Sequence, residues 1–265
     1  MAHLTFTINY HTAWGEQVCL CGTTPELGNL NEDQALTLAA DGDNWSATVS
    51  IGETTDIAYY YFIRKGGHTV RREWGNNRKL HIIKGRKEFI INDLWKNKSY
   101  HSYLYSTVFT DTVFRHKATP LPTKYYSQTV LLNVICPYVA DDQMLMIIGE
   151  CEELGLWDLT LAKPLSYLDE GEWQITLDAR KLPAKSEYKF VIVEKNSGEA
   201  VHWEDGGNRV LTAEAVHKGN RVLVEMALHF NYQSFAYRGT GTAIPVFSLR
   251  TDESFGVGDF ADLRK

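Results

Sequence analysis

Hydrophobic and polar residues alternate along short stretches of this chain, which is the pattern of half-buried β-strands. From Leu4 to Tyr10 every second residue is apolar, and this period of two places the apolar side chains on one face. Similar short runs, bounded by turn residues, cover 18–21, 45–51, 57–63, 79–83, 130–135, 145–148, 173–177, 188–193 and 222–228. No stretch keeps the apolar spacing of a helix, so the sequence predicts an all-β protein.

The strands fall into two sets that belong to an internal repeat. Four anchors recur in the same order with an offset of 127 to 129 residues at their first residue: Gly22…Leu27-Gly28 with Gly149…Leu154-Gly155, Trp45 with Trp173, Tyr60-Tyr61-Phe62 with Tyr188-Lys189-Phe190, and Trp74…Asn77-Arg78 with Trp203…Asn208-Arg209, the last being two residues longer in the second copy. Such a series indicates two copies of one domain of about 95 residues.

Short strands with frequent turn signals are typical of immunoglobulin-like β-sandwiches. We therefore predict two tandem sandwiches, at residues 1–99 and 127–229. The stretch 100–126 contains Pro120 and Pro122 and has weak patterning, so it is interpreted as a linker. Residues 230–265 are set apart as a further linker and the beginning of another fold.

Composition narrows the class of function. The 265 residues include 27 Lys and Arg against 33 Asp and Glu, a net charge of −6, and nucleic-acid binders usually show a basic surplus. No apolar run approaches the roughly 18 residues of a membrane span. No secretory signal is visible at Met1. We expect a cytoplasmic protein that binds neither nucleic acid nor membranes.

The cysteines and histidines predict no metal site and no cofactor. Cys19 and Cys21 are two residues apart in a predicted strand, while Cys136 and Cys151 stand alone. This spacing favours reduced, half-buried thiols in a cytosol-like compartment. The nine histidines follow no metal-binding spacing.

The tryptophans are the most informative candidates for binding. Trp14, Trp74, Trp157 and Trp203 lie in predicted loops beside Gly, Asp or Glu, whereas Trp45 and Trp173 begin predicted strands and are expected in the core. An exposed indole can stack on the apolar face of a sugar ring while neighbouring polar side chains bind its hydroxyls. Alternatively, each loop indole could fold back onto its sandwich.

No catalytic constellation is recognisable from the residues alone. The sequence contains no P-loop and no nucleophile elbow. It also lacks a dinucleotide fingerprint, because the pair Gly256 and Gly258 is not followed by the third glycine. The residues by themselves indicate a tandem β-sandwich with exposed aromatic side chains, which fits a ligand-binding protein.

The repeat anchors resemble the starch-binding modules of carbohydrate-binding family 20, over roughly residues 2–98 and 127–228. The resemblance implies an α-1,4-glucan ligand such as starch, glycogen or maltodextrin. In the second copy it implies a site at Trp157, Lys189 and Trp203, with Glu204 and Asn208 beside them. The first copy departs from the pattern, with Leu30 and Tyr61 at the first two positions, and keeps Trp74 and Asn77. Trp14-Gly15-Glu16 matches the aromatic turn of the family's other site.

The last residues resemble the start of the cytosolic 4-α-glucanotransferases of glycoside hydrolase family 77. Ala243–Leu249 reads as a buried strand, and Asp252–Leu263 as a loop leading into a helix, the opening of a (β/α)8 barrel. The resemblance implies a parent enzyme of retaining mechanism whose catalytic residues lie beyond Lys265, so this part should be inactive. The alternatives are a noncatalytic glucan-targeting protein, or sandwiches for protein adhesion.

Overall fold

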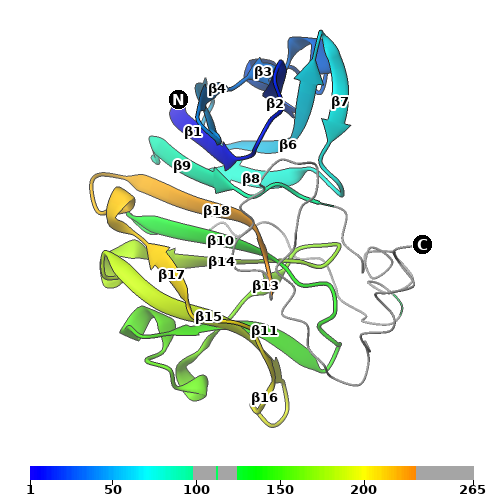
Figure 1. The fold of residues 1–265 in the computed structure, drawn as a ribbon. Coiled ribbons are helices and arrows are strands. Elements are labelled where there is room, and N and C mark those ends of the chain that lie inside the picture. The colour runs from blue at the N-terminus through cyan, green and yellow to red at the C-terminus, as the bar shows by residue number, and fades with distance from the viewer. Residues whose placement is uncertain (98–111, 113–123, 231–265) are drawn as a thin grey trace, which may run out of the picture.

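The computed structural model describes residues 1–97, 112 and 124–230 (Figure 1). Residues 1–97 are called the first copy below, and residues 124–230 the second copy. The strands of the first copy are β1 (Ala2–Asn9), β2 (Glu16–Gly22), β3 (Leu36–Thr37), β4 (Ala39–Asp41), β5 (Asn44–Ile51), β6 (Thr55–Lys65), β7 (His68–Arg72), β8 (Arg78–Ile82) and β9 (Glu88–Asp93). Those of the second copy are β10 (Thr129–Ile135), β11 (Gln143–Gly149), β12 (Lys163–Pro164), β13 (Ser166–Tyr167), β14 (Glu172–Asp178), β15 (Lys185–Glu194), β16 (Ala200–Trp203), β17 (Arg209–Thr212) and β18 (Arg221–His229).

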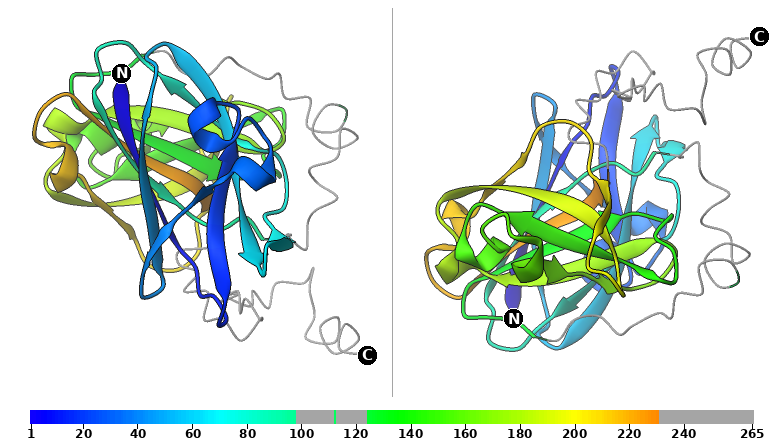
Figure 2. Two further views of the ribbon diagram at one scale, coloured as in Figure 1. Left: turned by 90° about the horizontal axis from the view of Figure 1, so that it is seen from above. Right: turned by 90° about the horizontal axis from the view of Figure 1, so that it is seen from below.

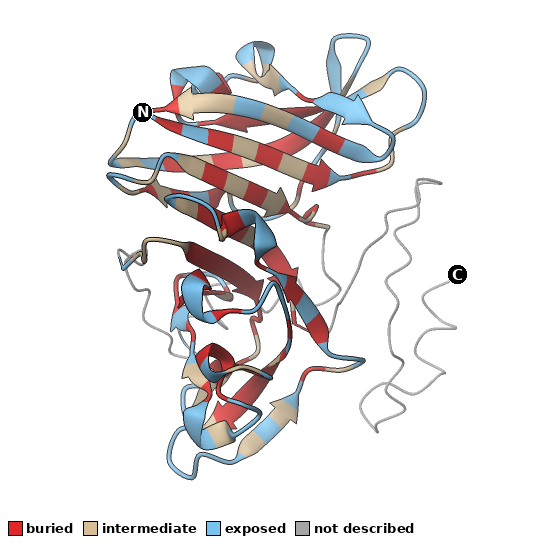
Figure 3. Ribbon diagram, turned by 90° about the vertical axis from the view of Figure 1, so that its left-hand side faces the viewer, coloured by how far each residue is buried: buried red, intermediate tan, exposed pale blue. Residues whose placement is uncertain are grey.

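The alternating sequence pattern corresponds to strands throughout the two copies. Each predicted run coincides with a strand, and the banding of buried and accessible residues is visible in Figure 3. The helical segments of the two copies are single 3-10 turns: η1 (Pro25–Leu27), η2 (Glu32–Gln34), η5 (Glu152–Leu154), η6 (Leu159–Leu161), η7 (Ala179–Lys181) and η8 (Glu214–Val216). The all-β prediction is therefore confirmed for the part of the chain that the structure describes.

The two copies share one large sheet instead of forming separate sandwiches. An eight-stranded sheet has the order β13-β14-β10-β18-β9-β1-β5-β4, and it crosses from copy to copy where β9 pairs with β18. This pairing is parallel and aligns Glu88 with Arg221 and Asp93 with Met226. Because β1 is parallel to β9 and β10 is parallel to β18, the four central strands all run in one direction.

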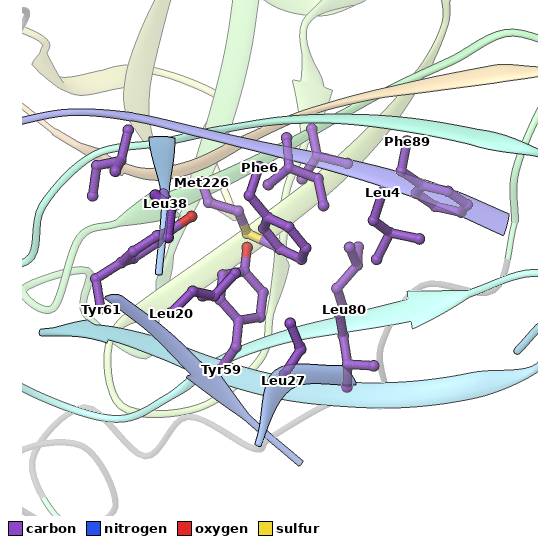
Figure 4. Packing of buried hydrophobic residues seen from close by; sticks show 14 of the residues in the cluster. Leu4, Phe6, Leu20, Leu27, Leu38, Tyr59, Tyr61, Leu80, Phe89 and Met226 are labelled. Carbon is purple, nitrogen blue, oxygen red and sulfur yellow. The ribbon is translucent and has the colours of Figure 1, made fainter. Parts of the chain in front are cut away.

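A smaller sheet packs on each face of the shared sheet, one from each copy. Alternate residues of a strand point to opposite faces. On β18, Val222, Val224 and Met226 pack in the core of the first copy, while Leu223 and Leu228 pack in that of the second. Figure 4 shows Met226 among core side chains of the first copy. Figure 2 shows the first copy in front from above and the second copy in front from below.

Polar side chains cross the junction as well. The Asn92 amide donates to the Glu225 carboxyl at 2.9 Å, and Lys96 Nζ lies 2.6 Å from a carboxylate oxygen of Glu172. Both partners of the second pair are largely buried. The interface between the copies therefore contains matched polar groups in addition to apolar packing.

The predicted core positions of two tryptophans are confirmed, but three of the four cysteines, which were predicted to be half-buried, are fully buried. The buried Trp45 and Trp173 donate their indole N–H groups to the carbonyl oxygens of Tyr10 and Cys136, at 3.0 and 2.9 Å. All four cysteines are free, and only Cys151 is partly accessible. Burial raises the pKa of the Cys19 and Cys21 thiols.

Two predictions fall on residues that the structure does not describe. The barrel opening lies within 231–265, and most of the proposed linker lies within 98–123. Within the described residues, no helix has the length and hydrophobicity needed to cross a membrane. The same residues contain no group of three or more His, Cys, Asp or Glu side chains arranged to hold a metal ion.

Candidate functional site

Trp157 is held on a tight turn that follows η5 in the second copy. Its backbone N–H donates to the Gly149 carbonyl oxygen at 2.9 Å, and its φ of 61° is left-handed. The turn begins at Gly155, where φ is +84° and an added Cβ would lie 2.7 Å from the carbonyl oxygen of Leu161. The backbone therefore requires glycine here. The turn leaves 38% of Trp157 exposed.

Trp203 and Lys189 lie on the outer face of the smaller sheet of the second copy. Trp203 ends β16 and pairs with Val191 of β15, and is 39% exposed. Lys189 is two residues before Val191, so its side chain points to the same face. The Lys189 ammonium donates to the carbonyl oxygens of Glu204 and Gly206 at 2.8 and 2.7 Å. A lysine ammonium has three donors, so one is left for a ligand.

The same strand also brings Trp157 close to this lysine. Gly149, which anchors the Trp157 turn, pairs with Tyr188, the residue immediately before Lys189. Trp157, Lys189 and Trp203 are therefore gathered on one surface, as the sequence predicted, although Trp203 ends a strand instead of lying in a loop. Two accessible indoles beside an ammonium group can stack against sugar rings and donate to a hydroxyl.

Glu204 supports this surface from below and does not face a ligand. Its carboxylate is buried and forms an ion pair with the Arg209 guanidinium, while its other oxygen accepts the Phe190 N–H at 3.2 Å. Arg209 also donates to the His229 carbonyl oxygen at 2.6 Å. Glu204 is thus a positioning residue for the segment that begins at Trp203.

Asn208 is the remaining residue of the predicted site in the second copy. Its amide donates to a carboxylate oxygen of Glu187 at 2.8 Å at the surface. This bond orients the Asn208 side chain at the start of β17, beyond the turn that Lys189 holds.

The first copy presents a different set of side chains at the equivalent surface. Leu30 takes the place of Trp157, with a φ of 60° and an N–H that donates to the Gly22 carbonyl oxygen. Strand register makes Tyr60, and not Tyr61, the residue equivalent to Lys189. Tyr59 pairs with Gly22 in the first copy just as Tyr188 pairs with Gly149 in the second. Tyr61 is buried in the core.

The structure also shows that Trp74 is not the residue equivalent to Trp203, as the sequence alignment had it. The buried pair of Glu73 and Arg78 matches that of Glu204 and Arg209, so Arg72 stands at the position of Trp203. Trp74 directly follows Glu73 and therefore corresponds to Asp205, not to Trp203. Its backbone N–H donates to the Lys96 carbonyl oxygen at 2.9 Å. Asn77 keeps its equivalence with Asn208, since each immediately precedes the paired arginine.

Arg72 and Tyr60 are joined in the first copy by Glu32. Arg72 lies 4.9 Å from the centroid of the Tyr60 ring, and Glu32 accepts from Arg72, Tyr60 and Thr69. Burial acts to raise the pKa of Glu32, but the bonds from Thr69 and Arg72 outweigh it and hold the pKa below its usual value. This surface is a compact ionic cluster with no exposed indole.

The first copy carries its exposed indole elsewhere, at Trp14. Gly15 has a φ of +79°, and the turn is closed by a bond from the Glu16 N–H to the Ala13 carbonyl oxygen at 3.0 Å. The Ala13 N–H in return donates to the Glu16 carboxylate at 2.9 Å. Trp14 is 97% exposed, so both faces of its ring are accessible.

Comparison with known proteins places this fold and surface in a family. The model of the starch binding domain, carbohydrate-binding family 20, matches residues 1–90 and 127–222. The chain therefore belongs to this family and contains two copies of its domain.

Several known proteins are similar to this chain. The chain is 28% identical over 282 aligned positions to the 4-alpha-glucanotransferase DPE2 of Oryza sativa subsp. japonica, covering 98% of this chain and 29% of that protein. It is 33% identical over 94 residues to Glucoamylase-1 of Schizophyllum commune, covering 35% of this chain and 16% of the relative. The family 20 module of a maltotetraose-forming amylase from Pseudomonas saccharophila is a structural neighbour, with 18% identity, a TM-score of 0.30, and coverage of 34% and 99%. The chain thus spans less than a third of the length of the two sequence relatives.

The turn at Gly155 gives a direct test of how Trp157 is positioned. We expect Gly155→Ala to weaken binding to amylose about tenfold, because a left-handed alanine costs roughly 1–2 kcal/mol and its Cβ collides with the backbone. Affinity chromatography on amylose measures the loss. The control is Gly198→Ala, where φ is +73° but nothing lies within 4 Å of the added Cβ. Equal retention of both variants would contradict the assigned role of the turn.

Proposed function

We propose that this chain is the α-glucan-binding region of a 4-α-glucanotransferase. The observation that carries the proposal is the surface of the second copy, where Trp157 and Trp203 are accessible beside the Lys189 ammonium. Glucosyl rings stack on the two indoles, and Lys189 donates to a hydroxyl. Trp14 supplies a second, separate contact from the first copy. Membership of the starch-binding family supports an α-1,4-glucan such as starch, glycogen or maltodextrin as the partner.

The expected affinity is weak. Two stacked rings contribute about 0.5–1.5 kcal/mol each beyond the area they cover, and a few hydrogen bonds contribute about 1 kcal/mol each. A total of roughly 3–6 kcal/mol corresponds to a dissociation constant between about 6 mM and about 0.04 mM, since 1 mM corresponds to about 4.1 kcal/mol and each 1.4 kcal/mol is a factor of ten. Polymeric ligands with many repeated units are therefore the natural targets of such a surface.

The test is removal of one indole. We expect Trp203→Ala to weaken retention of the chain on an amylose column at least about tenfold, because the ring and the area it buries are lost together. Trp74→Ala, which removes an indole from a position that is not equivalent, should leave retention unchanged. Retention of the Trp203 variant equal to that of the wild type would refute the assignment of this surface.

Transfer of glucan segments is proposed for the whole protein and not for residues 1–265. The likeness to the rice 4-alpha-glucanotransferase over 98% of this chain supports it, as does the resemblance of the last residues to a glycoside hydrolase family 77 barrel. A retaining double displacement in the cytoplasm belongs to the same proposal. The alternative is a noncatalytic glucan-targeting protein, and assay of the complete protein for maltodextrin disproportionation distinguishes the two.

A further inference from the structure

A cavity of about 590 Å³ lies where the two copies meet. Its floor is the shared sheet, with Ile90 and Asn92 from β9, Leu94 just after that strand, and Leu223 and Glu225 from β18. Its wall is β17, from Arg209 to Thr212, which pairs with β15. The volume falls within the range of about 300–1,000 Å³ that is common for small-molecule sites. We call this space the intercopy cavity.

In the first copy a tyrosine packs beside the strand that corresponds to β17. β8 corresponds to β17, since Arg78 and Arg209 pair with Tyr59 and Tyr188 in the same way. Tyr125 packs against the core of the first copy, and its hydroxyl donates to the His81 carbonyl oxygen of β8 at 3.1 Å. In this register His81 corresponds to Thr212, which lines the intercopy cavity. A hydroxylated ring therefore lies beside β8 in the first copy, at the residue that corresponds to Thr212.

The lining of the intercopy cavity suits an uncharged ligand with both apolar and hydroxyl surfaces. Ile90 and Leu94 are half-buried and provide aliphatic contacts, while Asn92 and Glu225 form the polar part of the floor. Burial raises the pKa of Glu225 to about 7, so its charge is only partial near neutral pH. The Arg209 guanidinium is already bound to Glu204 and to the His229 carbonyl oxygen. Neither group favours a strongly anionic ligand.

From these contacts we infer that the intercopy cavity is a third binding site, formed by both copies, that takes a glucosyl unit of an α-glucan. The aliphatic floor contacts the apolar face of the ring, and Asn92, Glu225 and Thr212 bind its hydroxyls. The choice of a glucosyl ligand rests on the proposed function, whereas the position and the size of the site do not. Asn208 lines the cavity and also belongs to the family motif that begins at Trp203, so a bound chain could pass close to both sites.

The test separates this site from the indole surfaces by removing those surfaces first. In a Trp14→Ala, Trp157→Ala, Trp203→Ala triple variant of the whole 265-residue chain, maltotriose should still shift the backbone amide NMR signals of Asn92, Thr212 and Glu225. Adding Val210→Trp at the mouth of the cavity should lower that remaining affinity at least tenfold. The matched control adds Val70→Trp, on β7, because Val70 and Val210 are similarly exposed, at 50% and 57%.

The outcomes are distinct from those that test the proposed function. Absence of maltotriose-induced shifts in the triple variant would overturn the third site, and so would equal effects of Val210→Trp and Val70→Trp. If Val210→Trp does not fold, Thr212→Tyr blocks the cavity with the kind of ring that Tyr125 supplies in the first copy, and it must reduce the shifts. Loss of retention in Trp203→Ala together with no effect of the cavity variants would leave the proposed function intact and refute only this inference.

Discussion

Residues 1–97 expressed alone are expected not to form a stable fold, because part of their core is supplied by the second copy. Val222, Val224 and Met226 of β18 are fully buried against the first copy. Burying each such side chain contributes about 1.5–3 kcal/mol, so their loss removes roughly 5–9 kcal/mol. This is comparable with the entire stability of a domain, about 5–15 kcal/mol. Truncation also exposes the paired edge of β9, which invites aggregation.

Chemical denaturation and size-exclusion chromatography measure this effect. The 265-residue chain should unfold cooperatively, and residues 1–97 should be unfolded or aggregated under the same conditions. A control within the intact chain is Met226→Ala, which should cost about 2–5 kcal/mol, against Val201→Ala at an exposed position of β16, which should cost little. A monomeric, fully stable first copy would show that the shared sheet is dispensable.

The sequence predicted the strands well because their local pattern and their burial agree. In Leu4–Tyr10, for example, one face of the strand packs in the core and the other remains accessible, so the period of two is visible in the residues. Trp45 and Trp173 were likewise predicted as core residues, and both are buried with paired indole N–H groups.

The shared sheet was not predicted, although the sequence contains a signal for it. β9 includes Phe89-Ile90-Ile91, and β18 includes Val222-Leu223-Val224. A run of consecutive apolar residues is typical of a strand that is buried on both faces, as parallel strands usually are. What no single strand can reveal is its partner, because pairing of β9 with β18 joins residues more than a hundred positions apart.

The predicted site residues of the second copy lie on one surface, and those of the first copy were misaligned. Matching the copies by their aromatic residues made Trp74 the equivalent of Trp203. The buried ion pairs show that Arg72 is the equivalent residue. A glutamate followed five residues later by an arginine occurs in both copies and would have given the right register. Trp203 and Arg72 are accessible, so the fold does not depend on which of them is present, whereas loss of one partner from a buried ion pair is strongly destabilising.

Arg209→Ala is therefore expected to damage both stability and glucan binding in the second copy. The Glu204 side chain has no exposed surface, and removal of its guanidinium partner would leave a buried charge uncompensated. Breaking such a pair costs about 3–5 kcal/mol. The backbone of Glu204 accepts from Lys189, and Glu204 directly follows Trp203, so movement of this residue would displace the indole and the ammonium together.

Two comparisons distinguish this mechanism from a general effect of losing an arginine. Arg180→Ala also breaks an ion pair, with Asp178 at 2.7 Å, but the Arg180 side chain is 58% exposed, and surface pairs contribute only about 0–1 kcal/mol. That variant should keep its melting temperature and its retention on amylose. A double variant, Glu204→Met with Arg209→Met, replaces both charges with apolar groups and should recover much of the stability that Arg209→Ala loses. If Arg209→Ala were as stable as Arg180→Ala in thermal denaturation, the buried pair could not be what holds Trp203 and Lys189 in place.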